Sequence, residues 1–147
     1  MSEDAYRAPD IQLLGEEHVR RYQETDGEVG YIWNGVPILL LSTTGRKSGE
    51  RRTTPLIFGR DGDDYLVVAS MGGAPMHPNW YRNLLADPQA LIQVRAEHLE
   101  VTARTAGAEE KPRLWKIVVE QWPNYDVYQT RTDRVIPLVV LSPARRV

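Results

Sequence analysis

The stretch of sequence that decides the fold runs from residue 36 to residue 58 and reads VPILLLSTTGRKSGERRTTPLIF. A continuous apolar run of strand length, residues 36–43, comes first, and a second strand-like run covers residues 52–58. Between them lies GRKSG, whose two glycines and polar residues are typical of a turn. The stretch therefore predicts an antiparallel β-hairpin with a basic turn.

Breaker residues on either side of this hairpin divide the rest of the chain. Amphipathic spacing predicts an N-terminal helix over about residues 11–24. An Asp-Gly turn at residues 61–62 leads into a third strand at residues 65–69, and Pro78 is placed to begin a helix that ends near Leu85. Further strands are expected over residues 90–95, 99–105 and 136–141, and further helices over residues 109–121 and from Pro123 onward.

These elements predict an α+β fold. About six mostly antiparallel strands with peripheral helices favour a barrel-like sheet over a doubly wound one. A length of 147 residues suits one domain, residues 1–147, with a core and a pocket of its own.

Composition excludes several classes of protein. The chain is 41% hydrophobic and 26% charged, as ordinary globular proteins are, and its net charge of -2 does not favour a nucleic-acid binder. The acidic residues 1–4 do not begin a secretory signal, so a cytoplasmic location is expected. Cysteine is absent, and His18, His77 and His98 lie too far apart in sequence to favour a metal site. The sequence has no G-x-S-x-G, Walker or G-x-G-x-x-G motif, so hydrolase, nucleoside-triphosphate and Rossmann chemistry are not expected.

The basic turn is built like an anion-binding site. Residues 45–52, GRKSGERR, hold four cations, a serine and two glycines. Glycine allows positive φ, so that successive N–H groups can converge on an anion, and the cations add charge-assisted hydrogen bonds. A solvated hairpin that protects a sheet edge is the alternative for the turn alone. A second glycine pair, Gly72-Gly73, lies between a strand and a helix, and we predict that both backbone segments contact one ligand.

A set of aromatic side chains forms the second candidate feature. Trp122, Tyr125 and Tyr128 recur every third residue and so fall near one face of a helix. Core packing is the plain explanation of such a stripe. A phenol, however, stays protonated at neutral pH and can donate to an oxygen that gains charge during a reaction.

Five segments, in order over nearly the whole chain, resemble the deazaflavin-dependent nitroreductase family. They read WNGVP (residues 33–37), TTGRKSG (43–49), RDGDDY (60–65), VASMGGAPMHPNWY (68–81) and WPNYDVYQTRTDRVIP (122–137). The resemblance implies a split β-barrel of the flavin-reductase type and reduced 5-deazaflavin coenzyme F420 as hydride donor. It also implies a quinone-like acceptor, with nitroaromatic reduction in some members.

The resemblance assigns site residues in three groups. The phosphate and glutamate tail of the coenzyme is expected on Arg46, Lys47, Ser48, Gly49, Arg51 and Arg52, with Thr54, Pro55 and Leu56 lining the groove. The ring system is expected along Val68, Ala69, Ser70 and Met71, near Trp80. The acceptor is expected against Ser70 and the aromatic face of Trp122, Tyr125 and Tyr128, which together form the candidate catalytic set. No metal is implied.

The sequence departs from the family pattern at three positions. Relatives commonly carry lysine where this chain has Met71 and Met76, which puts the affinity for the coenzyme tail in question. Trp122 stands where some nitro-reducing members have tyrosine, so nitroreduction is less firmly implied than the redox class.

Two alternatives stay open at this stage. One is a split barrel that holds flavin mononucleotide, and the other is a carrier that binds the deazaflavin or a lipid-like molecule without turnover. The N-terminal helix is a candidate for contact with a membrane, although its acids Glu16, Glu17 and Glu24 favour a solvated helix.

Overall fold

The structure, a computed structural model, describes residues 6, 8–9 and 13–147. Its elements are α1 (Gly15–Thr25), β1 (Ile32–Trp33), β2 (Val36–Thr44), β3 (Arg51–Ile57), β4 (Gly59–Asp61), β5 (Asp64–Val68), the 3₁₀ turn η2 (Met71–Gly73), α2 (Asn79–Ala86), β6 (Gln89–Val94), β7 (Glu97–Thr105), α3 (Lys111–Gln121), α4 (Asn124–Thr130) and β8 (Leu138–Arg146). All six predicted strands are present. The short strands β1 and β4 were not predicted, because two or three residues give no readable periodicity.

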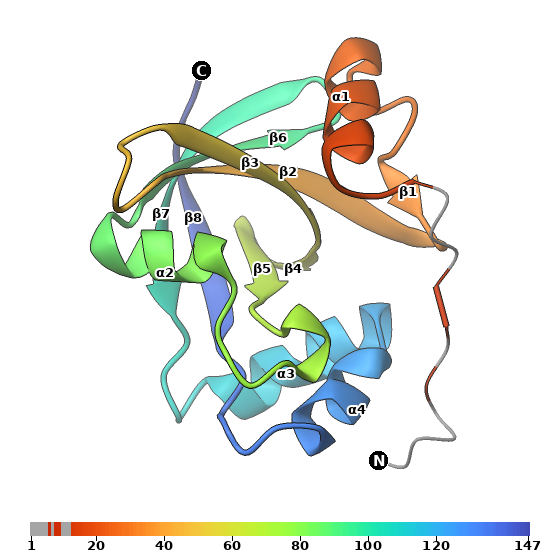
Figure 1. Ribbon diagram of the computed structural model, residues 1–147, viewed down its shortest axis with the longest axis vertical. Helices are drawn as coiled ribbons and strands as arrows, with labels where there is room; N and C mark the ends of the chain where they lie inside the picture. The colour runs from red at the N-terminus through yellow and green to blue at the C-terminus, as the bar shows by residue number, and fades with distance from the viewer. Residues whose placement is uncertain (1–5, 7, 10–12) are drawn as a thin grey trace.

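One curled antiparallel sheet organises the molecule (Figure 1). Its order is β1-β2-β6-β7-β8-β5-β4, and β3 pairs with β2 as a further edge strand. The predicted hairpin is confirmed, since Leu40 pairs with Pro55 and Thr44 pairs with Arg51 across β2 and β3. Pro55 lacks an N–H donor, and an edge strand tolerates it for that reason.

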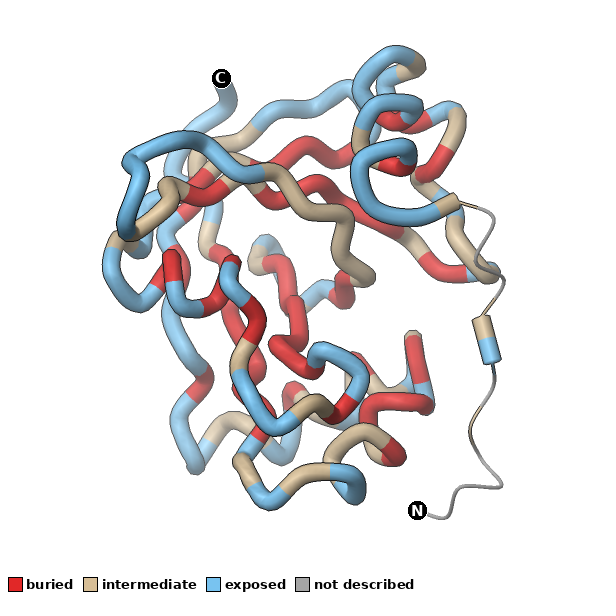
Figure 2. The backbone as a smooth tube through the Cα atoms, in the orientation of Figure 1, coloured by how far each residue is buried: buried red, intermediate tan, exposed pale blue. Residues whose placement is uncertain are grey.

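Both faces of the central strands are buried, which explains why they read as continuous apolar runs (Figure 2). Successive side chains of a strand point to opposite faces of the sheet. On β5, Tyr65 and Val67 join the core inside the curl, whereas Leu66 and Val68 pack against α3 and α4. Helices therefore cover the second face of the sheet, and α3 and α4 lie together at one end of the molecule, away from α1 (Figure 1).

The N-terminal helix is shorter than predicted. Residues 11 and 12 of the expected span lie outside the described residues, and α1 begins at Gly15. The Leu13 carbonyl accepts a hydrogen bond of 2.8 Å from Nε1 of Trp33, and Leu14 has an extended backbone. The apolar residue at position 14 thus continues the helical pattern without being helical. None of the described helices has the length and apolar character needed to cross a bilayer.

Candidate functional site

Two adjoining cavities open on the inner side of β3. The first, of about 400 Å³, is mainly apolar and lies between β3, the segment that follows β5, and α4. The second, of about 660 Å³, is mainly polar and lies between the β2–β3 turn and α2. Thr54 and Trp80 line both cavities, so the two cavities adjoin. We call them the apolar cavity and the cationic pocket.

Local hydrogen bonds hold the turn that forms the cationic pocket. The Gly45 N–H donates to the Glu50 carbonyl at 2.7 Å, and the Gly49 N–H donates to the Gly45 carbonyl at 2.8 Å. Gly49 has φ +73°, a conformation that favours glycine. The Ser48 hydroxyl accepts from the Glu50 N–H at 3.1 Å. The turn uses its glycines and serine to keep its own shape, and its cations are left to face the pocket.

Arg46 is held in place by asparagines of α2. Oδ1 of Asn83 accepts from the Arg46 backbone N–H at 3.2 Å and from its Nη1 at 2.9 Å, and Nη2 donates to Oδ1 of Asn79 at 3.4 Å. Asn83 is itself buried and donates to the Thr43 hydroxyl at 3.2 Å. This network fixes the guanidinium of Arg46 without neutralising its charge.

The other cationic side chains of the pocket are also not neutralised by strong ion pairs. Within the part of the chain that the structure describes, Lys47 and Arg51 form no ion pair. Arg52 pairs with Glu50 at 3.4 Å, but both side chains are mostly exposed and such a pair is weak. Glu16 is the one carboxylate among the described residues that line the pocket. The pocket therefore carries an excess of positive charge, although the whole chain is slightly acidic.

The segment after β5 forms one wall of the apolar cavity. Ser70, Met71 and Gly72 line the cavity, and Met71, Gly72 and Gly73 have φ values of +47°, +65° and +85°. A Cβ atom at Gly73 would lie 2.6 Å from the Tyr128 carbonyl oxygen. Glycine is therefore required at this position by both its backbone conformation and its close approach to α4.

The aromatic residues form the opposite wall. Trp122 follows the last residue of α3, whereas Tyr125 and Tyr128 belong to α4, and all three line the apolar cavity. Nε1 of Trp122 donates to the Tyr128 hydroxyl at 3.4 Å. Trp33 packs against Trp122 with ring centroids 5.7 Å apart. Among the described residues, none forms a hydrogen bond with the Tyr125 hydroxyl.

Burial keeps the Tyr125 phenol protonated. It raises the pKa of the Tyr125 phenol far above its usual value, and the neighbouring Tyr128 adds to the effect. Tyr125 is therefore a neutral hydrogen-bond donor at any physiological pH, as the sequence reasoning requires.

The structure brings most of the predicted site residues together. The apolar cavity gathers Thr54, Pro55, Leu56, Val68, Ser70, Met71, Trp80, Trp122, Tyr125 and Tyr128, and the cationic pocket gathers Arg46, Lys47, Ser48, Arg51 and Arg52. Two predicted residues line neither cavity. Gly49 is exposed on the turn, and Ala69 is fully buried in the core.

Other residues of the site were not predicted. Asn79 and Asn83 line the cationic pocket, and His18 and Trp33 line the apolar cavity. Trp33 lies in the WNGVP segment that carries the family resemblance, but the sequence assigned it no role in the site. The imidazole of His18 donates from Nε2 to the Gly30 carbonyl at 2.8 Å, a contact that no local pattern reveals.

Fold and site together define a class of protein: a split β-barrel in which an apolar cavity adjoins a cationic pocket. A family model described as F420H2-dependent quinone reductase matches residues 14–143. The chain therefore belongs to the F420H2-dependent quinone reductase family. It is accordingly an oxidoreductase that uses coenzyme F420, as the sequence resemblance implied.

Individual relatives agree with the family match. An F420H2-dependent quinone reductase from Mycobacterium tuberculosis strain H37Rv is 46% identical over 136 residues, which cover 90% of this chain and 91% of that protein. The solved structure of the F420H2-dependent reductase FDR-A matches with a TM-score of 0.68 and 44% identity, over 72% of this chain and 94% of that one. A structure described as a domain-swapped dimer matches with a TM-score of 0.70 and 40% identity, over 84% of this chain and 96% of that one. These matches confirm the split-barrel fold.

Proposed function

We propose that this chain transfers a hydride from reduced F420 to a quinone-like acceptor bound in the apolar cavity. The single observation that carries the proposal is that an apolar cavity and a cationic pocket adjoin at Thr54 and Trp80. A coenzyme with an aromatic ring at one end and a phosphate and carboxylates at the other matches this change from apolar to cationic lining. The residues present therefore fit the coenzyme that the family uses.

In this proposal the cationic pocket binds the anionic tail of the coenzyme and so orients the coenzyme. Arg46, preorganised by Asn83, and Lys47 supply charge-assisted hydrogen bonds to the anionic tail. Each such contact contributes about 1.5–3 kcal/mol to binding. Val68, Ser70 and Met71, beside Trp80, would hold the ring when the turn holds the tail.

The apolar cavity excludes water and supplies donors. When bound, the reduced deazaflavin supplies a hydride, that is, two electrons and one proton. A quinone that accepts it gains negative charge on oxygen and takes a second proton from solvent. Ser70, Tyr125 and Tyr128 line this cavity, and their hydroxyls would donate hydrogen bonds to that oxygen; donors of this kind lower the barrier where charge develops. No acid–base pair of side chains is required, because the coenzyme carries the difficult chemistry.

Nitroaromatic acceptors form the second part of the proposal. A nitro group also gains charge on oxygen as a hydride arrives, so the same donors serve it. Trp122 in place of a tyrosine removes one phenolic donor, and its indole N–H donates to Tyr128 instead, so we expect nitroaromatic turnover to be slower than quinone turnover.

The proposal is tested by binding and turnover on matched variants. The wild-type chain should bind F420 with a Kd in the micromolar range or tighter, about -8 kcal/mol, and should oxidise F420H2 with a quinone but show no turnover with NADH or NADPH. Arg46→Ala with Lys47→Ala should weaken binding ~10²-fold or more. The affinity of the wild type should also fall with added salt.

Arg145→Ala with Arg146→Ala is the matched control. It removes the same charge from exposed arginines that pair with Glu100 and Glu97 and line neither cavity. The proposal fails if both double variants bind F420 like the wild type, if NADH drives turnover without F420, or if bound F420H2 is never oxidised by any of a broad panel of acceptors. Binding and turnover of flavin mononucleotide in place of F420 would support the alternative cofactor.

A further inference from the structure

The segment after β5 has little backbone support of its own. Residues 69–77 connect β5 to α2 and form no β-ladder. Three of their φ values are positive, and the internal backbone hydrogen bonds are two short turns, Gly73 N–H to Ser70 carbonyl at 2.9 Å and Ala74 N–H to Met71 carbonyl at 3.1 Å. This segment nevertheless supplies Ser70 and Met71 to the apolar cavity. Its position must be set by contacts from elsewhere.

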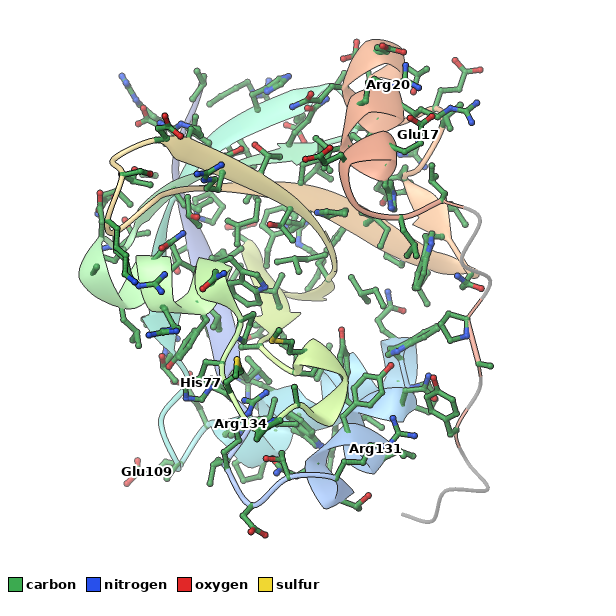
Figure 3. The ribbon with its side chains drawn as sticks, viewed as in Figure 1. Glu17, Arg20, His77, Glu109, Arg131 and Arg134 are labelled. Carbon is green, nitrogen blue, oxygen red and sulfur yellow. The ribbon has the colours of Figure 1, made fainter. Side chains whose placement is uncertain are left out.

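Arg134 supplies those contacts. Its Nε donates to the Ala74 carbonyl at 2.8 Å, Nη1 to the Ala69 carbonyl at 3.1 Å and Nη2 to the Ser70 carbonyl at 2.7 Å. Nη1 also lies 3.0 Å from Nδ1 of His77, and Figure 3 shows the two side chains next to each other. One guanidinium therefore joins four points of the segment, at both its beginning and its end.

Arg134 is in turn tied to the helix of the opposite wall. Gln129 of α4 donates from Nε2 to the Arg134 carbonyl at 2.8 Å, and its Oε1 accepts from the Ile136 N–H at 2.9 Å. The same helix carries Tyr125 and Tyr128. We call the side of the cavity formed by residues 70–72 the Ser70 wall, and the side formed by Tyr125 and Tyr128 the phenol wall. Side-chain hydrogen bonds of Arg134 and Gln129 connect these two walls.

The Arg134 contact fixes the tautomer of His77. A guanidinium has no acceptor and stays protonated, so Nδ1 of His77 must accept, which requires a neutral imidazole with its proton on Nε2. The charged groups that act on His77 from its surroundings are Arg134 and Arg82, both cations, and the Tyr81 ring of α2 packs against it with centroids 5.1 Å apart. Burial first, and then the two arginines, lower the pKa of His77 below its ordinary value of 6.5.

We infer that Arg134 is a positioning residue and that neutral His77 is its partner. The four contacts of Arg134 fix the Ser70 wall relative to the phenol wall. They thereby set the width of the cavity in which hydride donor and acceptor meet. This inference rests on the proposed function of the apolar cavity. Arg134 and His77 line neither cavity themselves. Their effect on turnover must therefore pass through the residues they hold.

The first test separates positioning from binding. Arg134→Met should lower kcat for F420H2 oxidation by a quinone at least tenfold, while the Kd for oxidised F420 changes less than about threefold, because the cationic pocket is untouched. Arg134→Lys keeps the charge but not the planar fork of donors and should fall between Arg134→Met and the wild type. Arg145→Met, which removes an exposed arginine that lines neither cavity, should change neither quantity. A wild-type kcat in folded Arg134→Met, or a loss of rate fully explained by the unfolded fraction at the assay temperature, overturns the inference.

The second test uses pH. Protonated His77 cannot accept from Arg134, so kcat of the wild type should decline as pH falls through the lowered pKa of His77, below about 6.5. His77→Asn offers an acceptor oxygen near the position of Nδ1 and does not titrate, so its acid decline should disappear. An acid decline that persists unchanged in His77→Asn overturns the role of the imidazole, and so does a profile of the wild type that is flat to pH 5.

A third readout needs neither coenzyme nor turnover. In the free protein, nitrogen NMR of the histidine rings should show His77 neutral at pH 7 with the proton on Nε2, and its pKa should rise in Arg134→Met when the nearby cation is lost. Amide exchange of residues 71–74 should accelerate at least tenfold in the same variant, while that of residues 39–41 stays unchanged. A failure of F420 binding in the wild type would refute the proposed function, whereas a protonated His77 at pH 7 or unchanged exchange at residues 71–74 would refute this inference independently.

Discussion

Removal of the Tyr125 hydroxyl tests whether the aromatic wall takes part in turnover. The structure allows the effect of Tyr125→Phe on the free energy of unfolding to be separated from its effect on the turnover rate. Among the described residues, none is hydrogen-bonded to this hydroxyl, so Tyr125→Phe leaves no buried group unpaired and should change the free energy of unfolding by less than ~1 kcal/mol. Tyr125 lines the apolar cavity, where the acceptor oxygen of the proposed reaction would gain charge, and a lost donor of this kind costs up to ~3 kcal/mol of barrier. We therefore expect turnover to slow by up to ~10²-fold with the melting temperature nearly unchanged.

The neighbouring phenol modifies this expectation. Tyr128 accepts from Nε1 of Trp122 and can still donate to the same acceptor oxygen as Tyr125. The two phenols partly substitute for each other, so Tyr125→Phe and Tyr128→Phe singly should cost less, and the double change should cost more than their sum.

The assay is stopped-flow oxidation of F420H2 by a water-soluble quinone, with the Kd for F420 and the melting temperature measured on the same samples. Tyr81→Phe is the matched control, because the Tyr81 hydroxyl bonds to Thr105 at 2.8 Å and lines neither cavity. It should lower the melting temperature slightly and leave the rate intact. Full activity of the double phenylalanine variant would refute the reasoning, because the tyrosines would then serve packing alone. Tyr125→Ala would in that case still destabilise the fold by ~3–5 kcal/mol through the cavity it creates.

Three further predictions concern residues around the site. Gly73→Ala puts a Cβ on a left-handed backbone and against the Tyr128 carbonyl, so it should lower the free energy of unfolding by about 3 kcal/mol. Thermal unfolding should then show a melting temperature lower by roughly 6–12 °C. A loss of less than about 1 kcal/mol in the free energy of unfolding would contradict the close approach. Asn83→Ala should weaken F420 binding about tenfold in a fluorescence titration because Arg46 loses its support, and unchanged affinity would show that Arg46 needs none. Burial raises the pKa of Tyr22 to about 12, so the phenol ionises at lower pH in the unfolded chain than in the folded one. The free energy of unfolding should therefore fall as pH rises from about 10 toward 12. Urea titrations should show a shallower fall with pH in Tyr22→Phe, and an equal fall in both proteins would refute this.

The sequence determined the local part of the site and not its long-range contacts. The hairpin of residues 36–58 was predictable because strand, turn and strand are adjacent, and the glycines of the turn need only local conformation. The contact of Arg46 with Asn83 spans 37 residues, and that of Arg134 with Ala69 spans 65. Such pairs leave no periodicity in a single sequence, so they required the structure.

The start of α1 shows a different limit. The apolar spacing at Leu14 matched a helical pattern, but its extended backbone places Leu14 before the start of α1, where it lines the apolar cavity. Trp122 was assigned to the face of a helix and lies instead at the junction of α3 and α4, where it still reaches the same cavity. The family resemblance named residues that line the two cavities even where the predicted bounds of the helices around them were imprecise.

The meeting of the two cavities at Thr54 and Trp80 alone, among the described residues, has a consequence for engineering. In the proposed mode of binding, the β2–β3 turn and α2 would hold the tail of the coenzyme, whereas Trp122, Tyr125 and Tyr128 come from residues 122–128. Chimeras of this chain with a relative, joined after α2 near Asp87, would exchange Trp122, Tyr125 and Tyr128 and keep the cationic pocket. Because Arg134 on one side of the junction contacts the Ser70 segment on the other, such chimeras would measure how far acceptor range can change without a change in coenzyme affinity.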